Sequence, residues 1–343
     1  MNKAYRIEKI SQETYLSFLG VVKNTHWGNL MLPDEYNIDM WGGVVKEDAQ
    51  VIGGWVGMLR GNKPVVRLIA KSVYFDSYPI FENSEQTEKY QLALIDSMRD
   101  WARKEGVVMF KLTHWVRGTD LPYLQVEKNA TFLSHLPEKI DDMWDIVDKK
   151  HRNRFRKGEK NGVEVCAYRG EDAIAQLPIF QELREQTQQH AINRNAKASI
   201  LLKSDKFFSD LIRRTDSTLF IGWLGDKPAT VALMIASGNT AYYHMGGSDY
   251  ELNRQVGSSA YVFWKVFEYY INRPDVKYVD MGGAPVNPEP EHPAYGVYMF
   301  KKSYGGEYME FDAGVIPISK WKYAVLKFAL SQRKLLRMFS KVF

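Results

Sequence analysis

The sequence has one cysteine, Cys166, among its 343 residues. This excludes an intramolecular disulfide framework and is typical of a protein from a reducing compartment. Because Cys166 follows Val163 and Val165 in a predicted strand, we expect a buried, unreactive thiol. No apolar run approaches the roughly 20 residues that a membrane-spanning helix needs, and residues 1–6 do not resemble a secretory signal. We therefore expect a cytoplasmic protein.

The sequence also lacks the usual signatures of metal, hydrolase and nucleotide sites. Its seven histidines show no metal-ligand spacing. It contains no Gly-x-Ser-x-Gly elbow, no Walker A loop and no Rossmann glycine triplet. These absences argue against a metalloenzyme, an α/β-hydrolase and a nucleoside-triphosphatase, and we expect no metal.

Charge of one sign is concentrated in two short stretches. Residues 319–343 carry seven Lys or Arg and no acidic residue, and without them the chain has 39 basic against 41 acidic residues. Residues 149–160 carry seven basic residues and one acid. Two basic patches on a nearly neutral body predict a polyanionic partner, such as RNA phosphate, a pyrophosphate or an anionic membrane surface.

The order of the predicted elements repeats once along the chain. The first half is predicted to contain strands within 42–75, a helix at 84–106 and a strand at 107–112. The second half repeats this order with strands at 163–168, 218–224, 229–236 and 240–245, a helix at 258–271 and a strand at 276–281. This repetition predicts an α+β protein of two similar domains, 1–137 and 138–317, with mixed sheets flanked by helices. Residues 318–343 are predicted to form a basic amphipathic helix that packs back on the first domain.

The stretch from Tyr242 to Gly306 holds the strongest indications of a functional site. A strand, a Gly-Gly break and a polar loop precede the helix at 258–271, and the unpaired N–H groups of a helix start attract anions. The equivalent loop of the first half, 76–83, has no glycine and contains Pro79. We therefore expect an anion site in the second half only.

Three positions in this stretch suggest chemistry. The segment Arg254-Gln255-Val256-Gly257-Ser258-Ser259 resembles the pyrophosphate loop of GNAT acyltransferases, although Ser259 stands where Gly or Ala is usual. An ordinary helix N-cap at Ser258 or Ser259 explains the same residues equally well. Lys301, near a glycine turn, is a candidate for polarising a carbonyl group, with a solvated surface lysine as the alternative. Asp280, at a strand end, is either a general base or a turn aspartate.

Taken together, these stretches resemble the Fem family of peptidoglycan bridge aminoacyltransferases, which consist of two GNAT-like domains. The residues that carry the resemblance are the basic run 150–160, Tyr242–Ser248, the helix with Trp264, Val279–Gly283, and Tyr295-Gly296 followed by Phe300-Lys301 and Tyr304-Gly305-Gly306. Some members insert a long helical hairpin in the second domain. This chain lacks the insertion and therefore resembles the shorter members. It also departs from the family at the phosphate-binding arginine, where it has His190, with Arg194 nearby.

The resemblance implies transfer of an amino acid from aminoacyl-tRNA, a co-substrate rather than a cofactor, onto an amine of a UDP-linked or lipid-linked muropeptide. The catalytic residues it implies are Lys301 and Asp280. The substrate-binding residues are Trp27, His190, Arg194, Tyr243 and Phe300, expected around a cleft between the domains. The acyl-donor loop comprises Arg254, Gly257, Ser258 and Ser259. The residues expected to contact RNA or phosphate are Arg152, Arg154, Arg156 and Lys157.

Two other functions fit the same residues. An acyl-CoA-dependent GNAT N-acyltransferase, acting on an amino sugar of a surface polysaccharide, explains the loop at Gly257 better and the basic run less well. A non-catalytic adaptor that binds RNA or a membrane through residues 319–343 is the third reading. For residues 319–343, we favour a helix whose apolar side packs on the first domain and whose basic side faces solvent.

Overall fold

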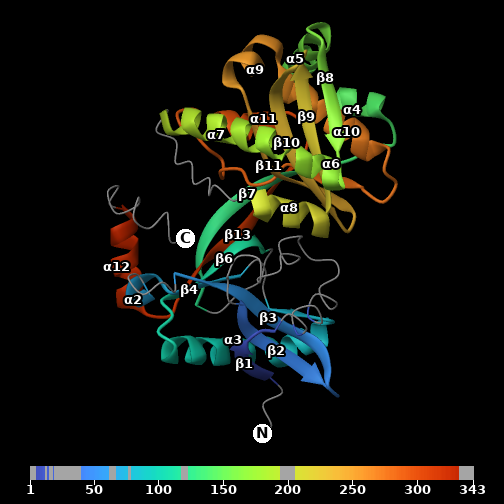
Figure 1. Cartoon of the computed structure of the whole chain (residues 1–343). Coiled ribbons are helices and arrows are strands. Elements are labelled where there is room, and N and C mark those ends of the chain that lie inside the picture. The colour runs from blue at the N-terminus through green and yellow to red at the C-terminus, as the bar shows by residue number, and fades with distance from the viewer. Residues whose placement is uncertain are drawn as a thin grey trace. The chain divides into compact units, whose positions relative to one another are not determined.

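The computed structural model describes residues 5–11, 14, 18, 40–61, 67–75, 79–116, 123–193 and 205–331. Backbone contacts divide the chain into two units (Figure 1). Unit 1 comprises Met1–Lys128 and Phe311–Phe343, and unit 2 comprises Asn129–Glu310. Within the described residues, none of the helices combines the length and hydropathy needed to cross a lipid bilayer.

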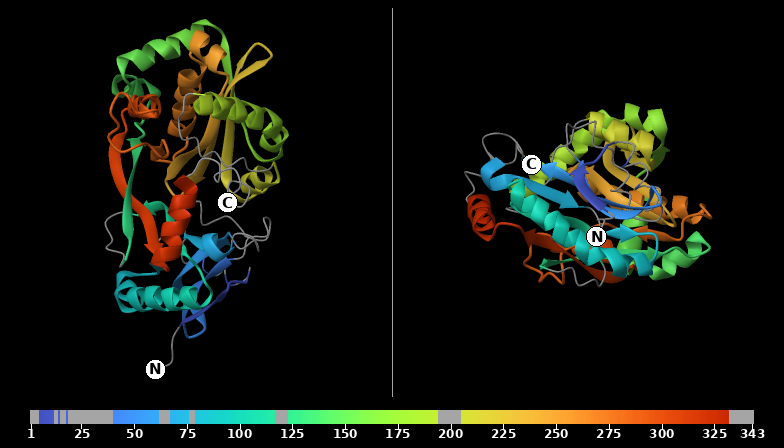
Figure 2. Two further views of the ribbon diagram at one scale, coloured as in Figure 1. Left: turned by 90° about the vertical axis from the view of Figure 1, so that its left-hand side faces the viewer. Right: turned by 90° about the horizontal axis from the view of Figure 1, so that it is seen from below.

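Unit 1 has a mixed sheet with the strand order β1-β2-β3-β4-β6-β13. Its strands are β1 (Tyr5–Lys9), β2 (Met40–Glu47), β3 (Gln50–Arg60), β4 (Ser72–Phe75), β5 (Ile80–Phe81, paired with β3), β6 (Met109–Val116) and β13 (Glu307–Pro317). Its helices are α2 (Arg67–Ala70), α3 (Ser84–Lys104) and α12 (Lys320–Ser331). The long helix α3 packs against β1, β2 and β3 (Figure 2), because its buried residues Leu94, Ile95 and Met98 lie on one helical face.

Unit 2 has a second mixed sheet, with the order β7-β12-β11-β10-β9-β8. Its strands are β7 (Gln125–His135), β8 (Val163–Tyr168), β9 (Asp216–Leu224), β10 (Lys227–Ser237), β11 (Thr240–Ser248) and β12 (Tyr278–Asp280). Its helices are α4 (Ile140–Ile146), α5 (Lys149–Lys160), α6 (Gly170–Ala175), α7 (Leu177–Asn193), α8 (Asp205–Arg214), α9 (Tyr250–Val256), α10 (Ser258–Ile271) and α11 (Tyr295–Lys302). Helices α5 and α10 cover one face of this sheet, and α7 and α8 cover the other (Figures 1 and 2).

The two sheets follow the same sequence of pairings. In unit 1 the pairings from β1 to β4 are antiparallel, β4 and β6 are parallel, and β6 and β13 are antiparallel. In unit 2 the pairings from β8 to β11 are antiparallel, β11 and β12 are parallel, and β12 and β7 are antiparallel. Helices α3 and α10 connect the two parallel strands of their units. The predicted repetition of one α+β fold is thus present in the structure.

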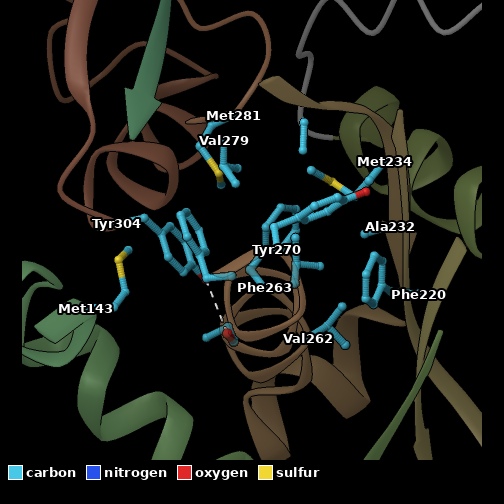
Figure 3. Packing of buried hydrophobic residues seen from close by; sticks show 14 of the residues in the cluster. Met143, Phe220, Ala232, Met234, Val262, Phe263, Tyr270, Val279, Met281 and Tyr304 are labelled. Carbon is cyan, nitrogen blue, oxygen red and sulfur yellow. Dashed lines mark hydrogen bonds between the residues drawn. The ribbon is translucent and has the colours of Figure 1, made fainter. Parts of the chain in front are cut away.

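The core of unit 2 is built around α10, which buries side chains along most of its length. Tyr304 contributes a fully buried ring, and its hydroxyl donates a hydrogen bond of 3.3 Å to the carbonyl oxygen of Ala260 (Figure 3). Phe263 and Tyr270 of α10 project between β10 and the segment that holds Tyr304 (Figure 3). These aromatic contacts anchor α11, which carries Lys301, to the sheet.

Two local expectations were wrong. Residues 250–256, expected as a polar loop, form the helix α9, because the Asp249 side chain accepts a hydrogen bond from the N–H of Leu252 and caps its start. Cys166, expected to be buried, is exposed. The two-residue period of a strand places Cys166 on the face opposite Val163 and Val165, and β8 pairs on one side only, with β9.

The C-terminal helix α12 packs within unit 1. Its residues Leu326 and Ala329 are buried in a cluster with Ala70 of α2 and Val108. Residues 332–343, the rest of the predicted helix, lie outside the described residues.

Candidate active site

The pairing of the parallel strands β11 and β12 ends next to a bulge in β11. The pairing of the two strands ends at Tyr242 and Asp280. On the other side of β11, Leu233 pairs with Met245 and Met234 pairs with Tyr243, so His244 is the extra residue. A bulge bends its strand and is common beside active sites. The regular pairing of β11 with β12 therefore ends beside the bulge, where Gly282 lies close to the carbonyl oxygen of Tyr243.

Lys301, in the last turn of α11, reaches the segment that follows β12. Its side chain is 6% exposed, and its Nζ donates a hydrogen bond of 2.7 Å to the carbonyl oxygen of Gly283, just past β12. The same Nζ lies 5.5 Å from the ring centroid of Tyr243. Burial lowers the pKa of Lys301 to about 8, against an opposing effect of Asp280. A buried lysine that titrates near neutrality is a feature of functional sites rather than of solvated surfaces.

Asp280 organises the turn that follows β12. Its Oδ1 accepts hydrogen bonds from the hydroxyl of Thr131 at 2.6 Å and from the N–H of Gly282 at 2.7 Å. Gly282 adopts a left-handed conformation with φ 71°, which glycine tolerates. Asp280 therefore fixes the Gly282-Gly283 turn whose carbonyl group accepts from Lys301, and these contacts give it a positioning role.

A second buried cation, Arg184, lies near Tyr243. Arg184 of α7 is 1% exposed, and its Nη1 donates a hydrogen bond of 2.7 Å to Gln181. Its guanidinium carbon lies 4.9 Å from the ring centroid of Phe208, and its Nη2 has no hydrogen-bond partner among the described residues. Burial lowers the pKa of Arg184 and raises that of Tyr243 to about 12. The site thus holds Tyr243 as a neutral phenol in a positive environment.

Phe300 forms part of an aromatic cluster that supports Lys301. Its ring centroid lies 5.3 Å from that of Phe263 and 5.6 Å from that of His151. His151 of α5 is buried, and neither ring nitrogen has a hydrogen-bond partner in the described part of the chain. Burial, followed by the charge of Arg154, lowers the pKa of His151 to about 4. The imidazole therefore packs as a neutral ring at physiological pH.

The start of α10, predicted as an acyl-donor loop, has an N–H group that is already bonded within the chain. Gly257 joins α9 to α10 in a left-handed conformation with φ 76°. The Asn253 side chain accepts a hydrogen bond of 2.9 Å from the N–H of Ser259. The hydroxyl of Ser258 is fully buried and bonds that of Thr230 at 2.7 Å. An N–H group that a pyrophosphate would need is thus already occupied.

The basic run folds as α5 and lies against the start of α10. Lys157 donates a hydrogen bond of 3.3 Å from Nζ to the carbonyl oxygen of Arg254, and a Cβ on Gly257 would lie 3.0 Å from the carbonyl oxygen of Arg154. Arg156 stacks over Trp144 at 4.9 Å, and Arg152 donates to the carbonyl oxygen of the same tryptophan. The predicted phosphate contacts and the predicted donor loop therefore form one surface, although about a hundred residues separate them in sequence.

The other predicted substrate residues have different positions. His190 on α7 stacks on Tyr250 of α9 at 3.9 Å, so its described contacts lie with α9 rather than with Lys301. Arg254 is exposed and pairs with Glu251. Trp27 and Arg194 lie outside the described residues. Among those that are described, no group of three or more His, Cys, Asp or Glu is placed to hold a metal ion.

Sequence reasoning missed Arg184, His151, Thr131 and Asn253. One signal for Arg184 was present, since it shares a helical face with Leu177 and Phe180, where an unpaired arginine is unexpected. Thr131 and His151 act through contacts made far along the chain, such as Thr131 with Asp280, and no local pattern marks them. Asn253 acts locally, on Ser259, but a polar residue in this position has no pattern of its own.

Comparisons with known proteins agree with this geometry. Residues 147–301 match the profile of a family described as an acetyltransferase (GNAT) domain. No curated protein matches the sequence. The chain is similar to the crystal structure of FemX, with 15% identity, 90% of this chain and 96% of the other covered, and a TM-score of 0.62.

Two further solved structures share the fold. L-PGS from Bacillus licheniformis is 12% identical, with 96% of this chain and 98% of the other covered and a TM-score of 0.59. A tandem GNAT protein from the clavulanic acid biosynthesis pathway is 14% identical, with 92% and 99% covered and a TM-score of 0.52. The chain therefore has the α+β fold of tandem GNAT proteins, and the domain match over residues 147–301 supports an acyltransferase.

Proposed function

We propose that this chain is an aminoacyltransferase of the Fem type, which moves an amino acid from aminoacyl-tRNA onto an amine of a peptidoglycan precursor. The observation that carries the proposal is the buried Lys301, held by the Gly283 carbonyl group where the pairing of β11 and β12 ends. The structural likeness to FemX adds support.

The reaction needs orientation and charge stabilisation more than a strong base. The neutral acceptor amine attacks the ester carbonyl of the donor, and a C–N bond forms as negative charge develops on the carbonyl oxygen. The ester C–O bond then breaks, and the ribose hydroxyl leaves with the proton that the amine has lost, relayed through water. Lys301 keeps N–H groups beyond the one bonded to Gly283, and these stabilise the oxyanion. With a pKa of about 8, it is protonated in about 90% of molecules at pH 7.

The surface beside the site favours a tRNA donor over coenzyme A. The N–H of Ser259 bonds Asn253 and is not available to a pyrophosphate. The exposed Arg154 and Lys157, three residues apart, share a side of α5 beside the start of α10, and the exposed Arg156 lies on another side of the same helix. Cations on a helix surface of this kind suit the phosphates of an RNA backbone.

The first experiment is a transfer assay with the purified full chain, a mixture of charged tRNAs and a UDP-muropeptide, read by mass spectrometry of the peptide. We expect a gain of one amino-acid residue that disappears after RNase treatment. Acetyl or longer acyl transfer from coenzyme A in its place would overturn the donor assignment. Absence of transfer from both donors would contradict the enzyme and favour an adaptor.

A binding experiment tests the tRNA surface separately from catalysis. Replacing Arg154, Arg156 and Lys157 together by Gln should weaken tRNA binding about tenfold or more at low salt, and should lower the salt dependence of binding. The matched control is replacement of three exposed cations of unit 1, Lys46, Arg103 and Lys104, by Gln, which should leave both the affinity and its salt dependence unchanged. Equal losses in the two variants would show that net charge, rather than α5, governs binding.

A further inference from the structure

The exposed side of α12 combines an apolar stripe with a basic one. Trp321, Val325 and Phe328 are 65%, 43% and 66% exposed. Their spacing of four and three residues places them along one stripe of the helix. Lys320 and Lys327 are also exposed, seven residues apart, and lie along the neighbouring stripe. Large aromatic side chains of this kind are uncommon on a surface that contacts only water.

The opposite side of α12 is already used by the fold. Leu326 and Ala329 are buried against α2 and β6, so the helix is anchored within unit 1 and cannot turn its exposed stripe inward. The neighbouring helix α2 exposes Leu68, at 68%, beside Arg67. Exposed apolar and basic side chains therefore occur on two helices that are in contact.

The charge of this region and its exposed aromatic side chains together indicate one kind of partner. All seven charged residues of 319–343 are basic, whereas the remainder of the chain is close to neutral. A partner has to match both this positive charge and the exposed tryptophan and phenylalanine. An anionic bilayer satisfies both, because aromatic rings settle at the headgroup level while lysines meet anionic lipid.

We propose that α12, together with α2, docks unit 1 on the surface of an anionic lipid bilayer, with Trp321 and Phe328 inserted at the headgroup level. The helix lies on the membrane and does not cross it. This attachment is independent of the transfer reaction, and it would bring the enzyme to an acceptor carried on lipid.

The test is co-sedimentation of the full chain with vesicles of phosphatidylcholine, alone or with about 30% phosphatidylglycerol. We expect binding to the anionic vesicles only, weakened by salt. The Trp321→Ser/Phe328→Ser variant should bind at least about tenfold more weakly, as should the charge-reversal variant Lys320→Glu/Lys327→Glu. Leu92→Ser, at an exposed position of α3, is the matched control and should bind like the unchanged protein.

The outcomes of this test distinguish an anionic membrane from the other possible partners of this surface. Thermal unfolding and tRNA binding of each variant show whether the substitutions act through folding or through RNA. Failure of the unchanged protein to bind anionic vesicles, or equal binding by the double variants, would overturn the proposal. Self-association that the Trp321→Ser/Phe328→Ser variant abolishes, without vesicle binding, would instead identify an interface between two copies of the chain.

Discussion

The same order of strand pairings encloses a different interior in each unit. Among the described residues, the buried polar side chains of unit 1 are limited to Ser72. Unit 2 buries four ionisable side chains, which are His151, Arg184, Asp280 and Lys301. Burial of a charged group costs free energy that apolar packing does not recover. Of these four, His151 packs as a neutral ring, and the burial of Arg184, Asp280 and Lys301 indicates that unit 2 is shaped by chemistry as well as by stability.

The strands that lead into the helical crossover also differ. In unit 1, β3 and β4 pair without a shift over residues 58–60 and 72–74. In unit 2, the equivalent pair β10 and β11 contains the bulge at His244. The N-cap of α3 is Asn83, whose side chain accepts a hydrogen bond from the N–H of Gln86. The N-cap of α10 is Gly257, which has a left-handed conformation and no side chain to accept one. One fold thus accommodates a regular crossover in unit 1 and a crossover with a bulge and a left-handed glycine in unit 2.

The largest effect expected is on transfer itself. Lys301→Met should lower kcat/KM by a factor of about 100 to 1000, because a preorganised oxyanion donor is removed. Lys302→Met, one residue further along α11 and exposed, is the matched control and should change kcat/KM little. Rates at subsaturating concentrations of charged tRNA give kcat/KM for both variants. Equal activity of the two variants would place the chemistry elsewhere.

Acid should destabilise unit 2 through His151. The pKa of this residue is about 4 in the folded protein and 6.5 as its ordinary value, so the unfolded state binds more protons between these pH values. Stability therefore falls as pH falls from 6.5 towards 4, by up to about 3 kcal/mol. His151→Phe should remove this loss. Hydrogen exchange of unit 2 peptides measures it, with unit 1 peptides as the internal control, and an unchanged acid response would contradict the assignment.

The smallest effect concerns the start of α10. Gly257→Ala should destabilise unit 2 by about 1–2 kcal/mol, since alanine at φ 76° is strained and its Cβ would lie 3.0 Å from the carbonyl oxygen of Arg154. Gly225→Ala, at φ 58° with open space around it, has the backbone strain alone and should cost less. Denaturant unfolding compares the two variants. A larger loss at Gly225 would show that the contact with Arg154 has no influence.

Much of this arrangement was predictable from sequence. The repeated order of strands and helices predicted the α+β fold, and the helix at 258–271 coincides with α10, because its apolar spacing is regular. The strands β7 and β13 were not predicted. Each completes the sheet of its unit from a segment outside the consecutive run of strands, as β13 does beside β6, and such long-range pairing leaves no local signature.

The candidate site was likewise predictable only in part. The motif around Phe300 and Lys301 predicts a role for both residues. The hydrogen bond that holds Lys301 to Gly283 depends on the turn that Asp280 organises, and the sequence does not show this turn. The segment 254–259 resembled a donor loop, yet Asn253, immediately before it, occupies the N–H of Ser259. Charge in a sequence shows which residues can bind an anion, and only the fold shows which of them are already engaged.

The most direct test of the central claim, that Lys301 acts as a buried cation in acyl transfer, is the pH dependence of kcat/KM. This quantity reports the pKa values of the free enzyme. We predict a falling limb near pH 8, where Lys301 loses its proton. In Lys301→Arg the limb should move to higher pH, because arginine stays protonated. Rates are corrected for spontaneous hydrolysis of the donor ester. A rate that rises through pH 8 without a limb, or a limb that persists unchanged in Lys301→Arg, would contradict the account.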